Sequence, residues 1–313
     1  MSSFNMSKIL LNGIFILSKY AIFIIVVALL IACQFTNSSS WAESKSKPTT
    51  SLQEIIEFAL DINSKSLSIN NSLPSEDVTF LVKKYYYQIQ TKLEQLATAK
   101  EVRGHFQKAV KKSEETFEQG DEVISRSDIT KLNLGLSDIL GNIVDLEYDL
   151  QIARLDLGKL INRELKSNSD IGKIDPSPIK FVHNNFADFL RDKSFSSKKK
   201  KQTADIAVSF NREFLELSEA DELILYKAYI SVKTSNAKMM IGKKNRKITR
   251  ALLITEAANY DFGIGNSEEL FEALIIYTRV FSSYLDSIYT FNLAVANLER
   301  LNDSTYRSID KFN

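Results

Sequence analysis

Two copies of a short turn motif, one in each half of the chain, constrain the fold more than any other sequence feature. The first reads Phe-Glu-Gln-Gly over Phe117–Gly120, and the second reads Tyr-Asp-Phe-Gly over Tyr260–Gly263. Each motif follows a long stretch with helical apolar spacing. A glycine at such a point ends a helix, because it adopts positive φ without strain. The sequence therefore predicts a helix, a tight turn and a second helix, twice over.

The residues after each turn predict where the returning helices begin. Ser127 precedes Asp128, and Ser267 precedes Glu268 and Glu269. A serine at a helix start caps free N–H groups, and carboxylates are favourable at the positive end of the helix dipole. Two such hairpins in one chain predict an internally duplicated, elongated α-structure.

The composition is that of a folded protein rich in helix. The chain has 313 residues, of which 44% are hydrophobic and 25% are charged, and its net charge is +1. This is too apolar for global disorder, and the balanced charge gives no electrostatic reason to expect nucleic acid. Only four prolines and ten glycines interrupt the chain. So few helix breakers favour long helices over an all-β chain, and the predicted class is all-α.

Residues 1–42 are interpreted as an export signal followed by a tether. The strongly apolar stretch from Tyr20 to Ala32 is short for a membrane-spanning helix, although a signal anchor is possible if the stretch is counted from Ile9. Small residues after the apolar core favour a signal that is removed. Two cleavage sites compete: Ser40-Trp41-Ala42 suits ordinary signal peptidase, and Leu30-Ile31-Ala32-Cys33 is similar to a lipobox.

Under the lipobox interpretation, Cys33 is lipidated and becomes the first residue of the mature chain. Gln34 beside it would then suit sorting to the outer membrane of a Gram-negative cell. Cys33 is the only cysteine, so an intrachain disulfide is excluded. Both cleavage sites place the mature chain outside the cytoplasm, in the cell envelope.

Periodicity divides the remainder into two helical repeats. Residues 43–165 form the first predicted repeat, 166–201 a proline-containing linker, and 202–313 the second. In the first repeat, helices are expected over 51–70, 75–118 and 127–165, with Ser51 and Glu54 forming a capping box. In the second repeat, helices are expected over 202–259, with a kink near Gly242, and over 267–301. Helices of this length, roughly 60 Å, must pack side by side as coiled-coil-like hairpins.

No residue pattern indicates an enzyme. The two histidines, His105 and His183, have no cysteine or second histidine at metal-ligand spacing. The sequence contains no phosphate loop, nucleophile elbow or zinc-protease motif. We therefore expect no catalysis, no metal and no cofactor.

At the level of these helices and turns, the chain resembles the TolC-like outer-membrane factor family. The stretches that match are Leu52–Asn63, which is similar to the family's opening helix, Val78–Ile161 and Arg246–Arg300, and the turn segments carry most of the specificity. The family forms exit ducts of drug efflux pumps and type I secretion systems. The resemblance implies two structural repeats in each subunit and a homotrimer that encloses a tunnel.

The resemblance also implies roles for individual residues at the turns. The family's turns form the periplasmic mouth of the duct and dock a periplasmic adaptor protein, which links the duct to an inner-membrane pump. The matching residues are Gly120, Ser127, Asp128, Gly263 and Ser267. Acids that ring the family's mouth match Glu269 and Glu272, although both are also simply favourable at a helix N-terminus. The family's gate-closing tyrosine and aspartate match Tyr260 and Asp128.

Three departures from the family pattern are visible. The family's gate arginine falls near Gly265, the first turn is longer than usual, and the family's β-barrel hairpins fall where this chain has only Asn70–Pro74 and Lys180–Lys201. The expected protein is therefore a periplasmic helical subunit of an outer-membrane efflux or secretion duct. It would be held at the outer membrane by a lipid anchor or derive from a form that lost its barrel. The alternatives are a barrel-less periplasmic coiled-coil lipoprotein that binds envelope partners without conducting, and an unrelated helical scaffold.

Overall fold

The structure is a computed structural model that describes residues 51–65, 73–120, 124–166, 171, 175–192 and 218–312, with side chains described as far as Thr305. The described part belongs to one compact unit, Thr49–Asn313. The predicted export signal, the tether and Cys33 lie outside the described residues. So do residues 66–70 and 202–217, which were expected to be helical. The proposed division at 42, 165 and 201 stays a prediction.

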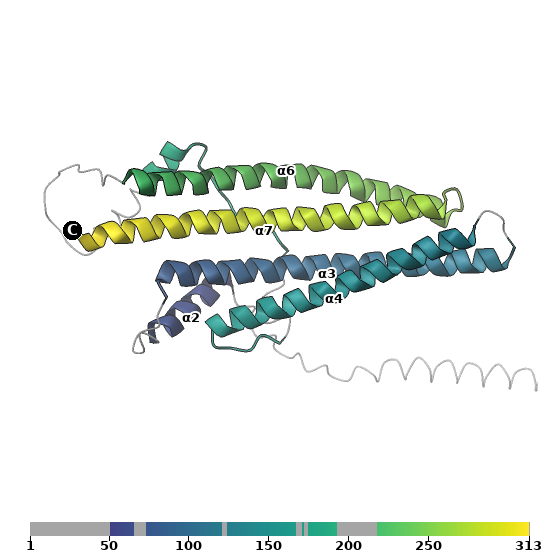
Figure 1. Ribbon diagram of the computed structural model, residues 1–313, viewed down its shortest axis with the longest axis horizontal. Coiled ribbons are helices and arrows are strands. Elements are labelled where there is room, and N and C mark those ends of the chain that lie inside the picture. The colour runs from purple at the N-terminus through teal and green to yellow at the C-terminus, as the bar shows by residue number, and fades with distance from the viewer. Residues whose placement is uncertain are drawn as a thin grey trace, which may run out of the picture. The chain divides into compact units, whose positions relative to one another are not determined.

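Five long or medium helices make up most of the described chain (Figure 1). They are α2 (Leu52–Lys65), α3 (Ser75–Glu118), α4 (Arg126–Leu160), α6 (Glu219–Asp261) and α7 (Ser267–Phe312). A further short helical segment covers residues 186–192. The described residues contain no strand, so the predicted all-α class is confirmed. None of the described helices is long and apolar enough to cross a membrane.

Reciprocal capping boxes begin α2 and α4. At α2, the Ser51 N–H donates to Glu54 Oε2 at 2.7 Å and the Glu54 N–H donates to Ser51 Oγ at 3.2 Å, which confirms the predicted box. At α4 the capping residue is Ser125, whose partner is Asp128. The prediction that Ser127 caps this helix was wrong. Ser127 instead lies within the first helical turn of α4, because Ser125 is the serine that stands three residues before Asp128.

The helices differ from the sequence expectations in four places. α6 begins at Glu219, because Ser218 is an extended N-cap residue whose hydroxyl accepts from the Asp221 N–H, so the expected single helix over 202–259 was wrong at its start. α4 ends at Leu160 rather than Leu165, because Asn162 takes a φ of 45° and the Arg163 N–H donates back to the Gly158 carbonyl at 2.9 Å. α7 continues to Phe312, beyond the expected end at Leu301. α6 runs through Gly242 as one continuous element, and this glycine lies against Tyr284 of α7.

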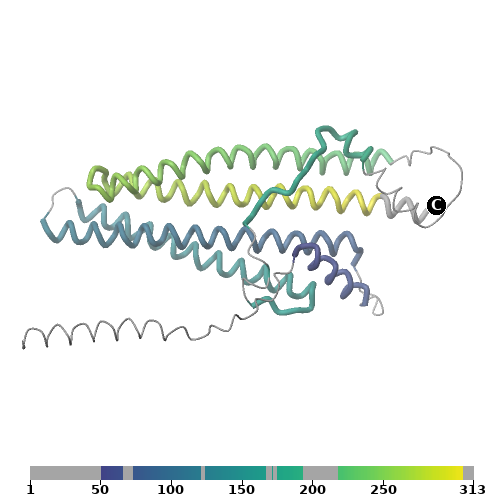
Figure 2. Tube along the Cα trace, turned by 180° about the vertical axis from the view of Figure 1, so that it is seen from behind, coloured from purple at the N-terminus to yellow at the C-terminus, as the bar shows by residue number. Residues whose placement is uncertain are grey.

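Away from the turns, the four long helices lie side by side in the order α6, α7, α3, α4, and near the turns α4 also contacts α7 (Figures 1 and 2). Each hairpin is antiparallel, and α3 and α7 form the seam between the two hairpins. The short helix α2 packs on α3 at the end far from the turns, where α4 diverges from α3 in both views. The side-by-side packing of two long hairpins is therefore as expected.

Polar contacts define the antiparallel register along the α3–α7 seam. Arg300 Nη1 donates to Asp77 Oδ1 at 2.9 Å, and Lys83 Nζ lies 2.7 Å from Glu299 Oε2. Near mid-seam, the buried Gln95 Nε2 donates to Ser282 Oγ and Asp286 Oδ1, both at 2.8 Å. Desolvation raises the pKa of the Asp286 carboxyl, against the opposing effects of Gln95 and Lys92. Because buried polar groups must be paired, a shift of register would leave these groups unsatisfied.

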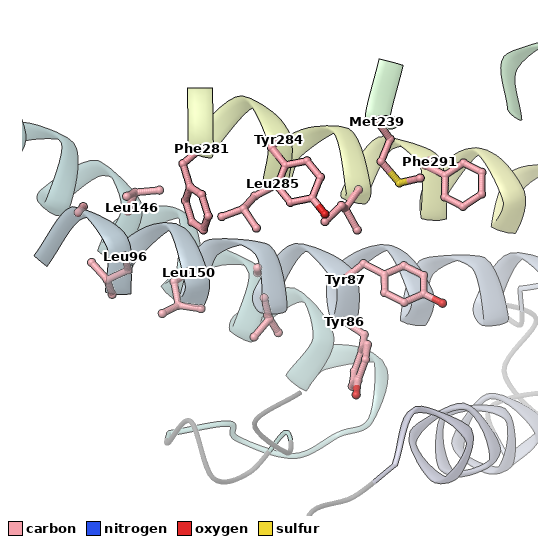
Figure 3. Close-up of a cluster of buried hydrophobic side chains, with 14 of the residues drawn as sticks. Tyr86, Tyr87, Leu96, Leu146, Leu150, Met239, Phe281, Tyr284, Leu285 and Phe291 are labelled. Atoms are coloured by element: carbon pink, nitrogen blue, oxygen red, sulfur yellow. The ribbon is translucent and has the colours of Figure 1, made fainter. Parts of the chain in front are cut away.

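The apolar core follows the same seam. Figure 3 shows Phe281, Leu285 and Tyr284 of α7 facing α3, with Leu146 and Leu150 contributed from α4. All of these side chains are buried. The core is thus a long, thin apolar layer between antiparallel helices that lie side by side, which is the packing expected of coiled-coil-like hairpins.

We expect the stability of this core to fall in alkaline solution. Burial raises the pKa of Tyr87 from 10.0 to about 12, so the fold keeps a proton that the unfolded chain has released. Stability is therefore lost as the pH rises from 10 toward 12, and up to pH 11 the loss for this residue is about 1.4 kcal/mol. Urea midpoints at pH 9 and pH 11 measure the loss. Tyr87→Phe should shrink it, whereas phenylalanine in place of the exposed Tyr148 should leave it unchanged.

Candidate functional site at the hairpin turns

Both turn glycines adopt the conformation that the sequence predicted. Gly120 has a φ of 82° and Gly263 a φ of 73°. Each glycine directly follows the C-cap residue of the preceding helix, which is Gln119 for α3 and Phe262 for α6. Only glycine takes this left-handed conformation without a steric penalty. The predicted helix stops are therefore confirmed at both turns.

The α6–α7 turn is closed by backbone hydrogen bonds. The Gly263 N–H donates to the Tyr260 carbonyl at 3.2 Å, and the Ile264 and Gly265 N–H groups donate to the Asn259 carbonyl at 2.9 and 3.0 Å. This pattern satisfies carbonyls that a helix end leaves free. A Cβ at Gly265 would lie 2.9 Å from Asn259 Cβ, so a larger residue there would push the turn open.

Tyr260 ties the α6–α7 turn to the first hairpin. Its side chain is buried, and its hydroxyl lies 2.8 Å from Ser113 Oγ while donating to the Ala109 carbonyl at 3.1 Å. Burial raises the pKa of this phenol, opposed by the hydrogen bond to Ser113. The residue matched to the family's gate tyrosine is thus part of the packing between α3 and α6 within one chain.

Lys112 caps the C-terminal end of α6 from the neighbouring helix. Its ammonium donates to the Tyr260 carbonyl at 2.6 Å and to the Asp261 carbonyl at 3.1 Å, and it lies 4.7 Å from the centre of the Tyr260 ring. A cation is favourable there because the C-terminal carbonyls carry partial negative charge. Lys112 therefore fixes the position of the C-terminal end of α6 relative to α3.

Asp128 is engaged within its own turn. The Ser125 hydroxyl donates to Asp128 Oδ2 at 2.6 Å, the Ser125 N–H donates to the same oxygen at 3.0 Å, and these bonds lower the pKa of the carboxyl. Its partners therefore differ from those of Tyr260, and the single chain does not bring the two predicted gate residues together. Ser127 lies exposed beside it, and Ser267 is the buried first residue of α7.

The acids after the second turn divide into three environments. The Glu269 N–H donates to Asn266 Oδ1 at 2.8 Å and its carboxylate accepts from the Asn266 N–H at 3.4 Å, which is a capping box. Glu268 Oε1 lies 2.9 Å from Lys131 Nζ of α4 and, as the main cause, raises the pKa of that lysine. Glu272 is exposed and adds a smaller effect on Lys131. Their proposed role as a mouth ring stays a prediction.

Sequence reasoning missed four residues at these turns. Ser125 and Asn266 stand three positions before an acid, and that spacing was a signal that could have identified both caps. No comparable signal pointed to Lys112 or Lys131. Their partners lie in the other hairpin, 148 and 137 residues away along the chain.

The outer helices of the layer each leave an apolar stripe exposed. On α4 and on α6 large apolar side chains recur at roughly heptad spacing on the side away from the neighbouring helix. On α4 they are Leu134, Leu140, Val144, Tyr148, Ile152 and Leu155; on α6 they are Leu223, Tyr226, Ile230, Ile241, Ile248 and Leu252. We call these the α4 edge and the α6 edge. Exposed stripes of this length mark interaction surfaces.

The two outer helices carry net charge of opposite sign, although Glu147 and Asp149 of α4 already pair with Lys100 and Lys92 of α3. Between residues 223 and 255, α6 has eight lysine and arginine residues and no aspartate or glutamate. Between residues 132 and 158, α4 has five acidic residues and one basic residue. No ion pair in the described part of the chain involves an α6 side chain. The basic α6 edge is therefore open to an acidic partner surface.

Across the described ranges, no three histidine, cysteine, aspartate or glutamate side chains are grouped so that they could hold a metal ion. The site is thus built from turns, caps and helix edges.

The two antiparallel hairpins are similar in fold to solved outer-membrane channels. The outer-membrane channel OprN superposes with a TM-score of 0.55 at 10% identity, covering 80% of this chain and 70% of that chain. The channel protein CusC gives 0.50 at 11%, covering 80% and 74%. VceC, an outer membrane protein of Vibrio cholerae, gives 0.50 at 9%, covering 80% and 75%. No protein-family model and no curated protein matches the sequence.

Proposed function

We propose that this chain is a helical subunit of an outer-membrane efflux or type I secretion duct in the envelope of a Gram-negative bacterium. The observation that carries the proposal is the shared fold with solved outer-membrane channels over 80% of the chain. The two hairpin turns are the proposed docking points for a periplasmic adaptor and, through it, an inner-membrane pump. In this function the chain transports and does not catalyse.

The edges support assembly of several copies into a closed wall. One chain supplies two hairpins, which form a layer with two open sides and cannot enclose a tunnel. The basic α6 edge of one copy complements the acidic α4 edge of the next, and both offer an apolar stripe. Contacts between different surfaces of identical subunits generate rings when the rotation closes. We propose a homotrimer on this basis and on the family resemblance.

The contact between edges can be tested by reversing charges. Lys243→Glu with Lys247→Glu on α6, or Asp138→Lys with Asp145→Lys on α4, should each weaken trimer formation about tenfold, since like charges then face each other. Combining the two pairs should restore assembly. Analytical ultracentrifugation of the purified full chain in detergent measures the distribution. Lys108→Glu on α3, away from both edges, is the matched control.

A monomer under all conditions would contradict the trimer, and reversal variants that assemble normally would contradict the contact between the α6 edge and the α4 edge. Conductance in planar bilayers then tests the duct itself. A trimer that conducts no ions would instead favour the second candidate, an envelope lipoprotein that binds partners without conducting. The Leu30-Ile31-Ala32-Cys33 sequence favours that candidate's lipid anchor. Loss of palmitate labelling and of outer-membrane fractionation in Cys33→Ala would support the anchor under either function.

A further inference from the structure

The α6–α7 turn exposes two large apolar side chains that the fold does not use. Phe262 and Ile264 flank Gly263, and each is 80% exposed. Turns ordinarily place asparagine, aspartate, serine or glycine at such positions. Burying a phenylalanine or isoleucine side chain stabilises a protein by about 1.5–3 kcal/mol, and here that contribution is left unused. Phe117, 40% exposed at the end of α3, adds a third apolar side chain at the same end of the layer.

The backbone of the turn that carries these two side chains is fixed before any partner arrives. The three hydrogen bonds to the Tyr260 and Asn259 carbonyls close the turn around Gly263. Lys112 and Tyr260 fix the turn against α3. A pre-formed turn loses little backbone conformational entropy on binding, which favours affinity.

The charges around the turn decide what kind of surface could cover these side chains. The outermost turns of the two hairpins, taken as residues 111–131 and 260–269, carry seven described acids and four described basic residues. Three of these four bases have partners at the turns: Lys131 pairs with Glu268, Lys111 pairs with Glu115, and Lys112 donates to the Tyr260 and Asp261 carbonyls. Three exposed acids, Glu114, Glu118 and Asp261, have no ion pair among the residues described. An anionic lipid surface or the same turn of a second copy would be repelled, whereas a basic surface is attracted.

We propose that Phe262 and Ile264 insert into an apolar pocket, edged by lysine or arginine, on a partner protein. This inference deepens the proposed function by naming the chemistry of the partner that the turns meet, and it rests on that function only for placing the turns opposite a partner. The apolar side chains provide the anchor, and the surrounding acids select a basic rim.

The test is a photo-crosslink in the cells that natively express the full chain. The probe is p-benzoylphenylalanine in place of Phe262, with the same probe in place of the exposed Val182 as the matched control. We expect an adduct only at position 262, and its attached peptide should hold apolar residues beside lysine or arginine. Ile264→Asp should lower the yield about tenfold, as for a hot-spot residue. Glu114→Lys with Glu118→Lys and Asp261→Lys should lower it similarly.

Each other outcome would overturn the proposal: no adduct, an adduct to lipid, to a second copy or to an acidic peptide, or a yield unaffected by Ile264→Asp. Because position 264 is exposed, its variants should keep the wild-type melting temperature, which circular dichroism checks. Trimer formation and conductance are measured on the same variants. If the wild-type chain forms no trimer or does not conduct, the duct is refuted. The crosslink tests the docking chemistry separately.

Discussion

Replacing Tyr260 with alanine is expected to lower the free energy of unfolding by about 4 kcal/mol, the range found for large aromatic side chains removed from cores. The ring is buried against α3, its hydroxyl contacts Ser113 and Ala109, and Lys112 lies over its face. Truncation would leave a cavity and remove the main link between the two hairpins at the turns. Urea denaturation of the full chain, followed by circular dichroism, measures the change.

Tyr260→Phe separates the hydroxyl from the ring. It should cost about 1–2 kcal/mol, because it leaves Ser113 Oγ and the Ala109 carbonyl without their partner in a buried site. Ser113→Ala combined with Tyr260→Phe should cost less than the sum of the two single changes. A loss below 1 kcal/mol in the alanine variant would show that Tyr260 is not structural in the single chain. The gate role implied by the family resemblance would then be the better account.

Valine at position 135 is expected to destabilise the chain by about 3 kcal/mol through overpacking. Gly135 of α4 lies over an aromatic pair in the core near the turns. A Cβ there would lie 2.6 Å from the Phe106 ring and 2.9 Å from the Phe271 ring, and those rings are 6.1 Å apart in a T-shaped contact. The Phe106 ring, which is the nearer of the two, cannot move far because it is fully buried. Thermal unfolding measures the loss.

The matched control is alanine in place of Gly104 of α3. An added Cβ there meets nothing within 4 Å, so the substitution should stabilise the chain by about 1 kcal/mol through helix propensity alone. If Gly135→Val were as stable as the wild-type chain, α4 would not approach α3 and α7 closely at this point. The layer order near the turns would then be wrong.

The helices themselves were largely predictable. The sequence predicted that one helix runs from Ser75 to Glu118, and α3 has those bounds. The stops at Gly120 and Gly263 were predicted from their place after apolar runs, and both glycines have positive φ. These features depend on neighbours within one or two helical turns, so a linear pattern contains the necessary information.

The caps show where local reasoning was applied at the wrong position. Ser127 was chosen because acids follow it, whereas the pair spaced for a capping box is Ser125 with Asp128. Glu269, matched to an acidic ring by resemblance, caps α7 together with Asn266. The family resemblance assigned a role to position 269. The geometry of a helix start, however, depends on a capping residue and an acid that stand three positions apart.

The sequence alone determined the helices, their turns and the duplication of the hairpin. The spacing of apolar residues and the conformation of glycine act locally along the chain, so both can be inferred from the sequence. Only the tertiary structure decided that α3 pairs with α7, that Lys112 and Tyr260 meet, and that α4 and α6 are left with open apolar edges of opposite charge. Those contacts join side chains 147 to 223 residues apart. The register that brings them together is set by side-chain packing between whole rods, which no pattern within one helix specifies.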